Sequence, residues 1–177
     1  NTARAISHAG QSHSIKVQRS NELNPLYQPI NPLESLPDTE KIELLNRVDR
    51  EARSQDPRVQ QVTVSMVAAH DTILVIDNEG KLSSDVRPLI RMNVQVIVEQ
   101  KGRREQGSAG GGARTALSFL LEQDREMEFA REAVRQALVN LEALDPPAGI
   151  LPVVLGPGWP GILLQDALGD GLEGDLN

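Results

Sequence analysis

Residues 89–100 read LIRMNVQVIVEQ, and this stretch decides the fold. Apolar and polar side chains alternate along it, with the period of two that is typical of a half-buried strand. One face carries Ile90, Met92, Val94, Val96 and Val98, and the other carries Arg91, Asn93, Gln95 and Glu99. A strand with one wetted face is typical of an antiparallel sheet that other elements cover on one side.

Further strands are predicted on the N-terminal side of this segment. Residues 59–67 (VQQVTVSMV) show the same alternation, and residues 72–76 (TILVI) are a short apolar run. Two turn segments, DNEGK at 77–81 and QKGRRE at 100–105, flank the long strand. Short strands joined by tight turns again favour an antiparallel sheet.

Two helices are predicted beside the sheet. The first starts at Asp38 or Thr39, whose side chains can cap free backbone amides, and ends before Pro57. The second spans residues 124–144. Their apolar positions are Ile42, Leu45, Val48 and Ala52 in the first helix, and Met127, Ala130, Val134, Ala137, Leu138, Leu141 and Leu144 in the second. Helices packed on one antiparallel sheet define an α+β fold.

The chain is expected to have three parts. Residues 1–37 are an extended, proline-rich segment, because each proline disfavours helix. Residues 38–147 are the α+β part, interpreted as the C-terminal portion of an N-terminal-type domain. Residues 148–177 begin a second domain, with a short buried strand (ILPVVLG, 150–156) and a helix (WPGILLQDALGD, 159–170). Both ends look cut, so we expect a fragment of a larger two-domain protein.

The composition narrows the classes of function. A net charge of −7 argues against a nucleic-acid phosphate backbone as the main partner. No apolar run approaches the roughly 20 residues that span a bilayer. The chain has no cysteine, which excludes disulfides and thiolate metal ligands within it. We therefore expect a cytoplasmic protein that acts on neither membranes nor nucleic acid.

A glycine run, GSAGGGAR at residues 107–114, is the first candidate site. Glycine-rich loops can cradle phosphates with backbone amides, but the phosphate loop requires GxxxxGK[ST], which is absent here. The run is interpreted as a flexible or bulged connection between strands, with contact to an anion or a substrate backbone as the alternative. The three histidines, His8, His13 and His70, are interpreted as surface residues, His70 at a strand end.

The second candidate site is acidic and lies near the C-terminal end. Gln165 is followed by four carboxylates: Asp166, Asp170, Glu173 and Asp175. A glutamine amide is a poor zinc ligand, and carboxylate oxygens suit magnesium or calcium better. Taken alone, the pattern favours a polar helix end, with an oxygen-ligated Mg²⁺ or Ca²⁺ site as the alternative.

Several longer segments resemble the TldD/PmbA family, most closely its metallopeptidase subunit. They are NRVDREARSQDPRVQQVTVSM, NEGKLSSDVRPLIR, REQGSAGGGAR, EAVRQALVNLEALDPPAGILPVVLGPGWPGILL and GLEGD, within residues 20–177. The resemblance implies a zinc peptidase that cleaves small or unfolded peptides in the cytoplasm, paired with a second family subunit. It also makes Gly110, Gly111, Gly112, Val153 and Leu155 candidates for contact with the peptide.

In that family the last helix carries HExxxH, in which two histidines bind zinc and the glutamate is the general base. The resemblance places the histidine slots on Gln165 and Asp170 and the glutamate slot on Asp166, so all three are substituted. It therefore implies a disabled site that binds no zinc, in an inactive subunit or a non-catalytic scaffold. Residues five apart lie about 140° apart on an α-helix, so this motif requires a distorted helix end, which Gly169 and Gly171 would permit.

Overall fold

The structure is a computed structural model that describes residues 16–19, 26–158 and 160–174. His8, His13 and Asp175 lie outside the described residues. The chain forms two compact units, unit 1 (Asn1–Ala143) and unit 2 (Leu144–Asn177).

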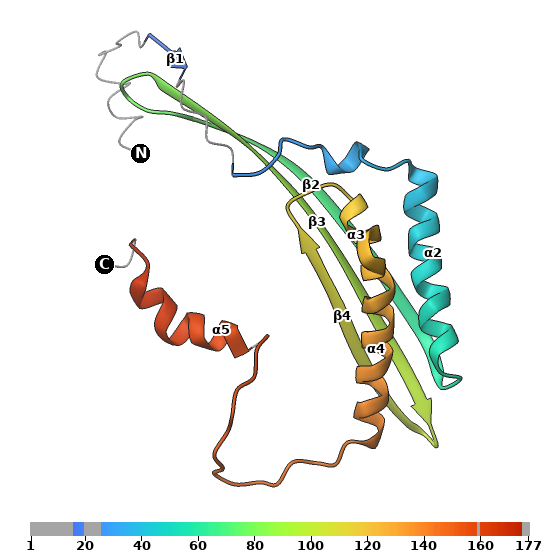
Figure 1. The fold of residues 1–177 in the computed structure, drawn as a ribbon. Helices are drawn as coiled ribbons and strands as arrows, with labels where there is room; N and C mark the ends of the chain where they lie inside the picture. Colours follow the sequence, from blue (N-terminus) through green and yellow to red (C-terminus); the bar gives the residue numbers. More distant parts are fainter. Residues whose placement is uncertain (1–15, 20–25, 159, 175–177) are drawn as a thin grey trace, which may run out of the picture. The chain divides into compact units, whose positions relative to one another are not determined.

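Unit 1 is built on an antiparallel sheet. The strands are β1 (Gln18–Arg19), β2 (Val59–Ile76), β3 (Lys81–Gln100) and β4 (Arg103–Ala113). Strand β3 pairs antiparallel with β2 along its length and with β4 from Ile90 onward, while β1 pairs parallel with its start. Helices cover one face of this sheet (Figure 1), so the predicted α+β fold is confirmed.

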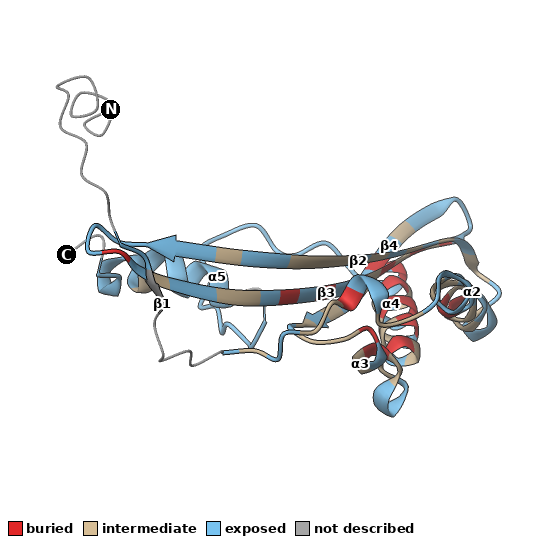
Figure 2. Ribbon diagram, turned by 90° about the horizontal axis from the view of Figure 1, so that it is seen from above, coloured by how far each residue is buried: buried red, intermediate tan, exposed pale blue. Residues whose placement is uncertain are grey.

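The alternation predicted for β3 is also confirmed. Ile90, Met92, Val94, Val96 and Val98 are fully buried, whereas Arg91 and Glu99 are exposed. In Figure 2 the buried positions gather where the helices lie against the sheet.

Strand β2 corrects two expectations. Residues 59–67 and 72–76 are not two short strands, because the hydrogen-bonded ladder with β3 continues through the intervening residues. His70 is therefore not at a strand end: it lies within β2, opposite Pro88.

The helical layer of unit 1 contains two long helices, α2 (Asp38–Gln55) and α4 (Arg125–Glu142). Shorter elements accompany them: η1 (Pro32–Glu34), α3 (Ser118–Leu121) and η2 (Glu122–Asp124). Helix α4 packs on β3 and β4, and α2 packs on β2 and α4. Within the described ranges, no helix is long and apolar enough to cross a membrane.

Helix α2 begins at Asp38 and ends at Gln55, before Pro57, as predicted, but its capping and part of its buried face differ from the prediction. Pro37 occupies the N-cap position and no side chain caps the free amides, so neither Asp38 nor Thr39 has the predicted capping role. Ile42 is 59% exposed, while Leu44, Val48 and Ala52 are buried. Leu45 also packs against the core, so Ile42 is the one predicted position that is wrong, because contact with α4 and β2 selects the buried face of the helix.

Helix α4 matches its prediction more closely. Its buried apolar residues are Ala130, Ala133, Val134, Ala137 and Leu141. Leu144 is 91% exposed because the helix ends at Glu142, which corrects its place in the stripe. The three alanines allow the helix axis to lie close to β4.

The glycine run is not a loop, because residues 107–113 form most of β4. A Cβ at Gly107 would overlap with the backbone of Ala133 and Ala137 in α4, and one at Gly111 would lie 2.9 Å from Phe129 Cζ. A Cβ at Gly110 or Gly112 would overlap with backbone carbonyls of β3. The run is therefore a strand whose missing side chains let a helix and a neighbouring strand approach closely.

An ion pair joins the end of α2 to the start of β2. Arg58 donates from Nε to Asp56 Oδ1 at 2.9 Å and from Nη2 to Oδ2 at 2.8 Å. These hydrogen bonds lower the pKa of Asp56 to about 2. The geometry is the bidentate one that strengthens arginine–carboxylate pairs.

This pair predicts a pH dependence of stability. Because the folded pKa of Asp56 lies below its unfolded value of about 3.9, the stabilisation is present above pH ~4 and is lost as the pH falls toward 2. Replacing Asp56 by Asn should lower the free energy of unfolding by about 1 kcal/mol at pH 7 and change little near pH 2. Urea unfolding of both proteins across this pH range measures the difference. An equal loss at both pH values would contradict the role of the ionised pair.

Unit 2 contains one helical segment preceded by an irregular stretch. Helix α5 (Pro160–Leu164) continues into a π-helical turn (Gln165–Gly169) and a 3₁₀ turn (Asp170–Leu172). The predicted strand at 150–156 is wrong: this stretch has no regular structure, and Val154 is 96% exposed. Among the described residues of unit 2 it has no strand to pair with, and an isolated strand is not stable.

Candidate functional site

The site predicted near the C-terminal end is built on the π-helical turn. The backbone N–H of Asp170 donates to the carbonyl of Gln165, five residues earlier. This hydrogen bond makes the turn wider than a turn of α-helix. Residues five apart are therefore separated by less than the angle of about 140° that they have on an α-helix. The expected distortion of the helix end is therefore present, and it brings the two slots predicted for zinc ligands to one side.

The side chain of Gln165 links two carboxylates within this site. Its Nε2 donates to Asp170 Oδ1 at 3.3 Å and to Glu173 Oε1 at 2.8 Å. Gly169 leaves room for this amide, because a Cβ there would lie 2.6 Å from Gln165 Cδ and closer still to Oε1. Asp166 lies in the same turn, is exposed, and takes no part in this network. The site is thus a solvated hydrogen-bonded cluster.

The donor set of this cluster does not fit zinc. Structural and catalytic zinc sites use imidazole and thiolate ligands with few carboxylates, and the cluster contains neither. The amide nitrogen of Gln165 presents hydrogens to both carboxylates, and such a nitrogen has no lone pair to offer a metal. In the described part of the chain, no three His, Cys, Asp or Glu side chains are grouped so as to hold a metal ion.

The residues predicted to contact a peptide are distributed over both units. Gly110, Gly111 and Gly112 lie in β4 of unit 1. Val153 and Leu155 lie in the irregular stretch of unit 2, where they are 75% and 49% exposed. Neither unit alone contains all five residues.

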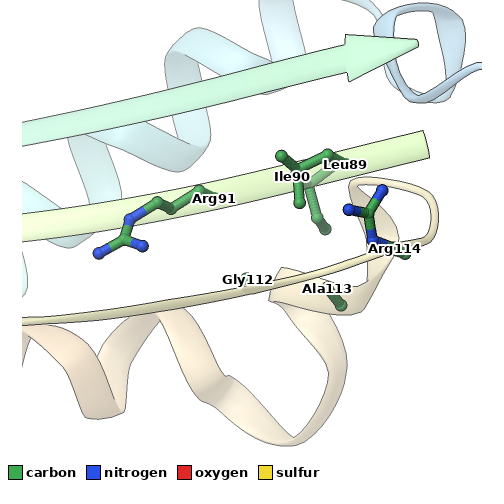
Figure 3. Close-up of a pocket in the computed structure, with 6 residues that line it drawn as sticks. All are labelled: Leu89, Ile90, Arg91, Gly112, Ala113 and Arg114. Atoms are coloured by element: carbon green, nitrogen blue, oxygen red, sulfur yellow. The ribbon is translucent and has the colours of Figure 1, made fainter. Parts of the chain in front are cut away.

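A pocket lies where β4 ends, and it is lined by Leu89, Ile90, Arg91, Gly112, Ala113 and Arg114 (Figure 3). The guanidinium groups of Arg91 and Arg114 point in different directions. That of Arg114 lies 5.1 Å from the ring centroid of Tyr27, in a cation–π contact. The two arginines therefore do not converge on one anion, which gives no support to an anion site beside the glycine run.

A buried charge that the sequence pattern does not reveal lies between the two long helices. Glu126, in the first turn of α4, is fully buried, and its Oε1 accepts a hydrogen bond from Arg47 of α2. Its other oxygen, Oε2, is buried without a hydrogen-bond partner among the described residues. This pair joins the two long helices, so we interpret it as structural.

The family follows from sequence comparison. The family model for the PmbA/TldA metallopeptidase central domain matches residues 31–141. The chain belongs to the TldD/PmbA family. It is 48% identical to the metalloprotease TldD homolog of Haemophilus influenzae over 98% of its length. It is 45% identical to the homolog of Buchnera aphidicola subsp. Schizaphis graminum over 99% of its length.

This TldD/PmbA chain spans 37% and 38% of the length of those two curated relatives. A crystal structure from Thermotoga maritima, of a protein described as a candidate modulator of a DNA gyrase, has the same fold with a TM-score of 0.63. The match covers 83% of this chain and 33% of that one at 18% identity, so it supports the fold alone.

Proposed function

We propose that this chain is part of a TldD-type metallopeptidase subunit in which the zinc site is disabled. The observation that carries the proposal is the π-helical turn. It brings Gln165 and Asp170, the two slots for zinc-binding histidines, into contact at 3.3 Å. The backbone geometry suits a motif with ligands five residues apart, whereas the donors are an amide and a carboxylate.

The substitutions have a direct chemical consequence. Zinc lowers the pKa of a bound water toward neutrality; without the ion that pKa stays far above neutral, and hydroxide is scarce at neutral pH. Asp166 in the general-base slot is shorter than glutamate by one methylene, and a misplacement of ~1 Å can cost ~10²-fold in rate. A subunit with these three residues is therefore inactive in peptide hydrolysis.

The remaining role is to bind peptide. Strand β4 pairs with β3 on one edge, and its other edge has no strand partner among the described residues. Gly110 and Gly112 of this strand are exposed and carry no side chain, so they add no bulk that would oppose an incoming chain. An extended, unfolded peptide would add to this edge by backbone hydrogen bonds. We place this function in the cytoplasm, with residues 148–177 at the start of the metallopeptidase domain.

A non-catalytic scaffold is the second candidate. Here a second TldD/PmbA subunit supplies the metal, and this chain supplies surface for the peptide and for the assembly. The replacement of all three motif residues, Gln165, Asp166 and Asp170, favours this role. The two candidates differ in one respect: only a disabled peptidase retains a site that restored ligands can reactivate.

The experiment is a restoration in the full-length protein, co-purified with its second family subunit. The triple variant Gln165→His, Asp166→Glu, Asp170→His should gain peptidase activity of at least ~10²-fold over the unaltered protein. Asp166→Glu alone is the matched control and should gain nothing, because it supplies no zinc ligand. A folded triple variant that gains nothing over the unaltered complex would favour the scaffold. Peptidase activity of the unaltered subunit purified without its second subunit would refute both candidates.

A further inference from the structure

The Gln165 amide has no role in the function proposed above, yet it is the centre of the cluster. A carboxamide NH₂ group has two donor hydrogens. Here they face two acceptors, Asp170 Oδ1 and Glu173 Oε1. We propose that Gln165 is a positioning residue whose amide holds this helix end together in place of a metal ion.

The charges at this helix end explain why a donor is needed. Asp166, Asp170 and Glu173 all lie at the C-terminal end of the helical segment that starts at Pro160. The helix dipole disfavours negative charge at that end, and carboxylates three or four residues apart repel each other. Residues 136–177 contain no lysine, arginine or histidine, and no ion pair offsets these carboxylates among the described residues. The side-chain amide of Gln165 instead donates hydrogen bonds to two of these carboxylates, Asp170 and Glu173.

The backbone and side chain of Gln165 close the same turn. Its carbonyl accepts from the Asp170 N–H, and its amide donates to the Asp170 carboxylate. The absence of a side chain at Gly169 leaves the space that the amide occupies. Gln165 and Asp170 are thus joined by two hydrogen bonds, one between their backbones and one between their side chains. The same Gln165 Nε2 also donates to the carboxylate of Glu173. This arrangement requires no ion.

The inference deepens the proposed function and rests on it only for the assignment of Gln165 and Asp170 as ligand slots. Its prediction is that the turn keeps its structure whether or not a metal is present. Hydrogen exchange measured by mass spectrometry on the full-length protein reports this directly, in peptides that cover the described residues 160–174.

In the unaltered protein, exchange in this region should be the same in EDTA, Zn²⁺, Ca²⁺ and Mg²⁺.

Gln165→Ala should speed exchange of the amides in the turn about fivefold, since each lost hydrogen bond weakens the closed state. Gln165→Glu should speed it further, because a third carboxylate joins Asp170 and Glu173. Added Ca²⁺ should then slow exchange in this variant alone, since clustered carboxylate oxygens bind that ion. Asp166→Asn is the matched control and should not speed exchange.

Two results would overturn the inference: faster exchange of the unaltered protein in EDTA, or equal exchange in Gln165→Ala and Asp166→Asn. Both are independent of peptidase activity. A finding that the unaltered protein cleaves peptides would refute the proposed function and leave this readout unaffected.

Discussion

Replacing Arg47 by Met is expected to lower the free energy of unfolding by about 3 kcal/mol, because it leaves a fully buried carboxylate uncompensated. Glu126 is 0% exposed and already has one oxygen without a partner. Arg47 is the one cation that contacts it among the described residues. Chemical denaturation followed by circular dichroism measures the loss.

Two variants test whether the cost comes from the unpaired charge. The double variant Arg47→Met, Glu126→Leu removes both partners and should recover most of the stability, because an apolar pair of similar volume replaces the ion pair. Arg50→Met is the matched control on the same helix. Arg50 pairs with Glu43 at side-chain exposures of 63% and 57%, so its loss should cost under ~1 kcal/mol. Equal losses for Arg47→Met and Arg50→Met would contradict this account.

Replacing Gly107 by Ala is expected to destabilise unit 1 by about 3 kcal/mol. The new methyl group would overlap with the backbone of Ala133 and Ala137. Backbone atoms of a packed helix cannot rotate away as a flexible side chain can, so α4 must move off the sheet. The thermal midpoint should fall, and hydrogen exchange along β4 should rise.

The matched control for this change lies one residue away. Ser108 is exposed on the opposite face of β4, so Ser108→Ala should change the free energy of unfolding by less than about 0.5 kcal/mol. A Gly107→Ala protein as stable as the Ser108→Ala protein would show that α4 does not approach β4 as closely as described.

The sequence predicted those parts of the fold in which a regular pattern of apolar and polar side chains indicates which residues are buried. Strand β3 is predictable because the apolar residues from Ile90 to Val98 alternate with polar ones, and α4 is predictable because its apolar positions recur at helical spacing. The glycine run has no side chains to alternate. Its identity as a strand depends on contacts with α4 and β3, which lie elsewhere in the sequence.

Other features depended on contacts that a local pattern cannot show. Glu126 and Arg47 are 79 residues apart, and nothing near either residue identifies the other as its partner. Residues 150–156 are rich in β-branched and apolar residues, but a strand forms only where another strand pairs with it. Conversely, the distorted helix end at Gln165 was predictable, because a motif with ligands five residues apart does not fit an α-helix.

The zinc content of the unaltered full-length protein shows whether the Gln165–Asp170 turn has lost the ability to bind this metal. The protein should be expressed with added zinc, dialysed against a weak chelator and measured by plasma mass spectrometry beside the triple variant. We expect zinc well below stoichiometry in the unaltered protein and about one zinc per chain in the triple variant, whose imidazoles match the metal. A stoichiometric zinc ion in the unaltered protein would contradict this expectation, because the ligands would then lie outside the Gln165–Asp170 turn.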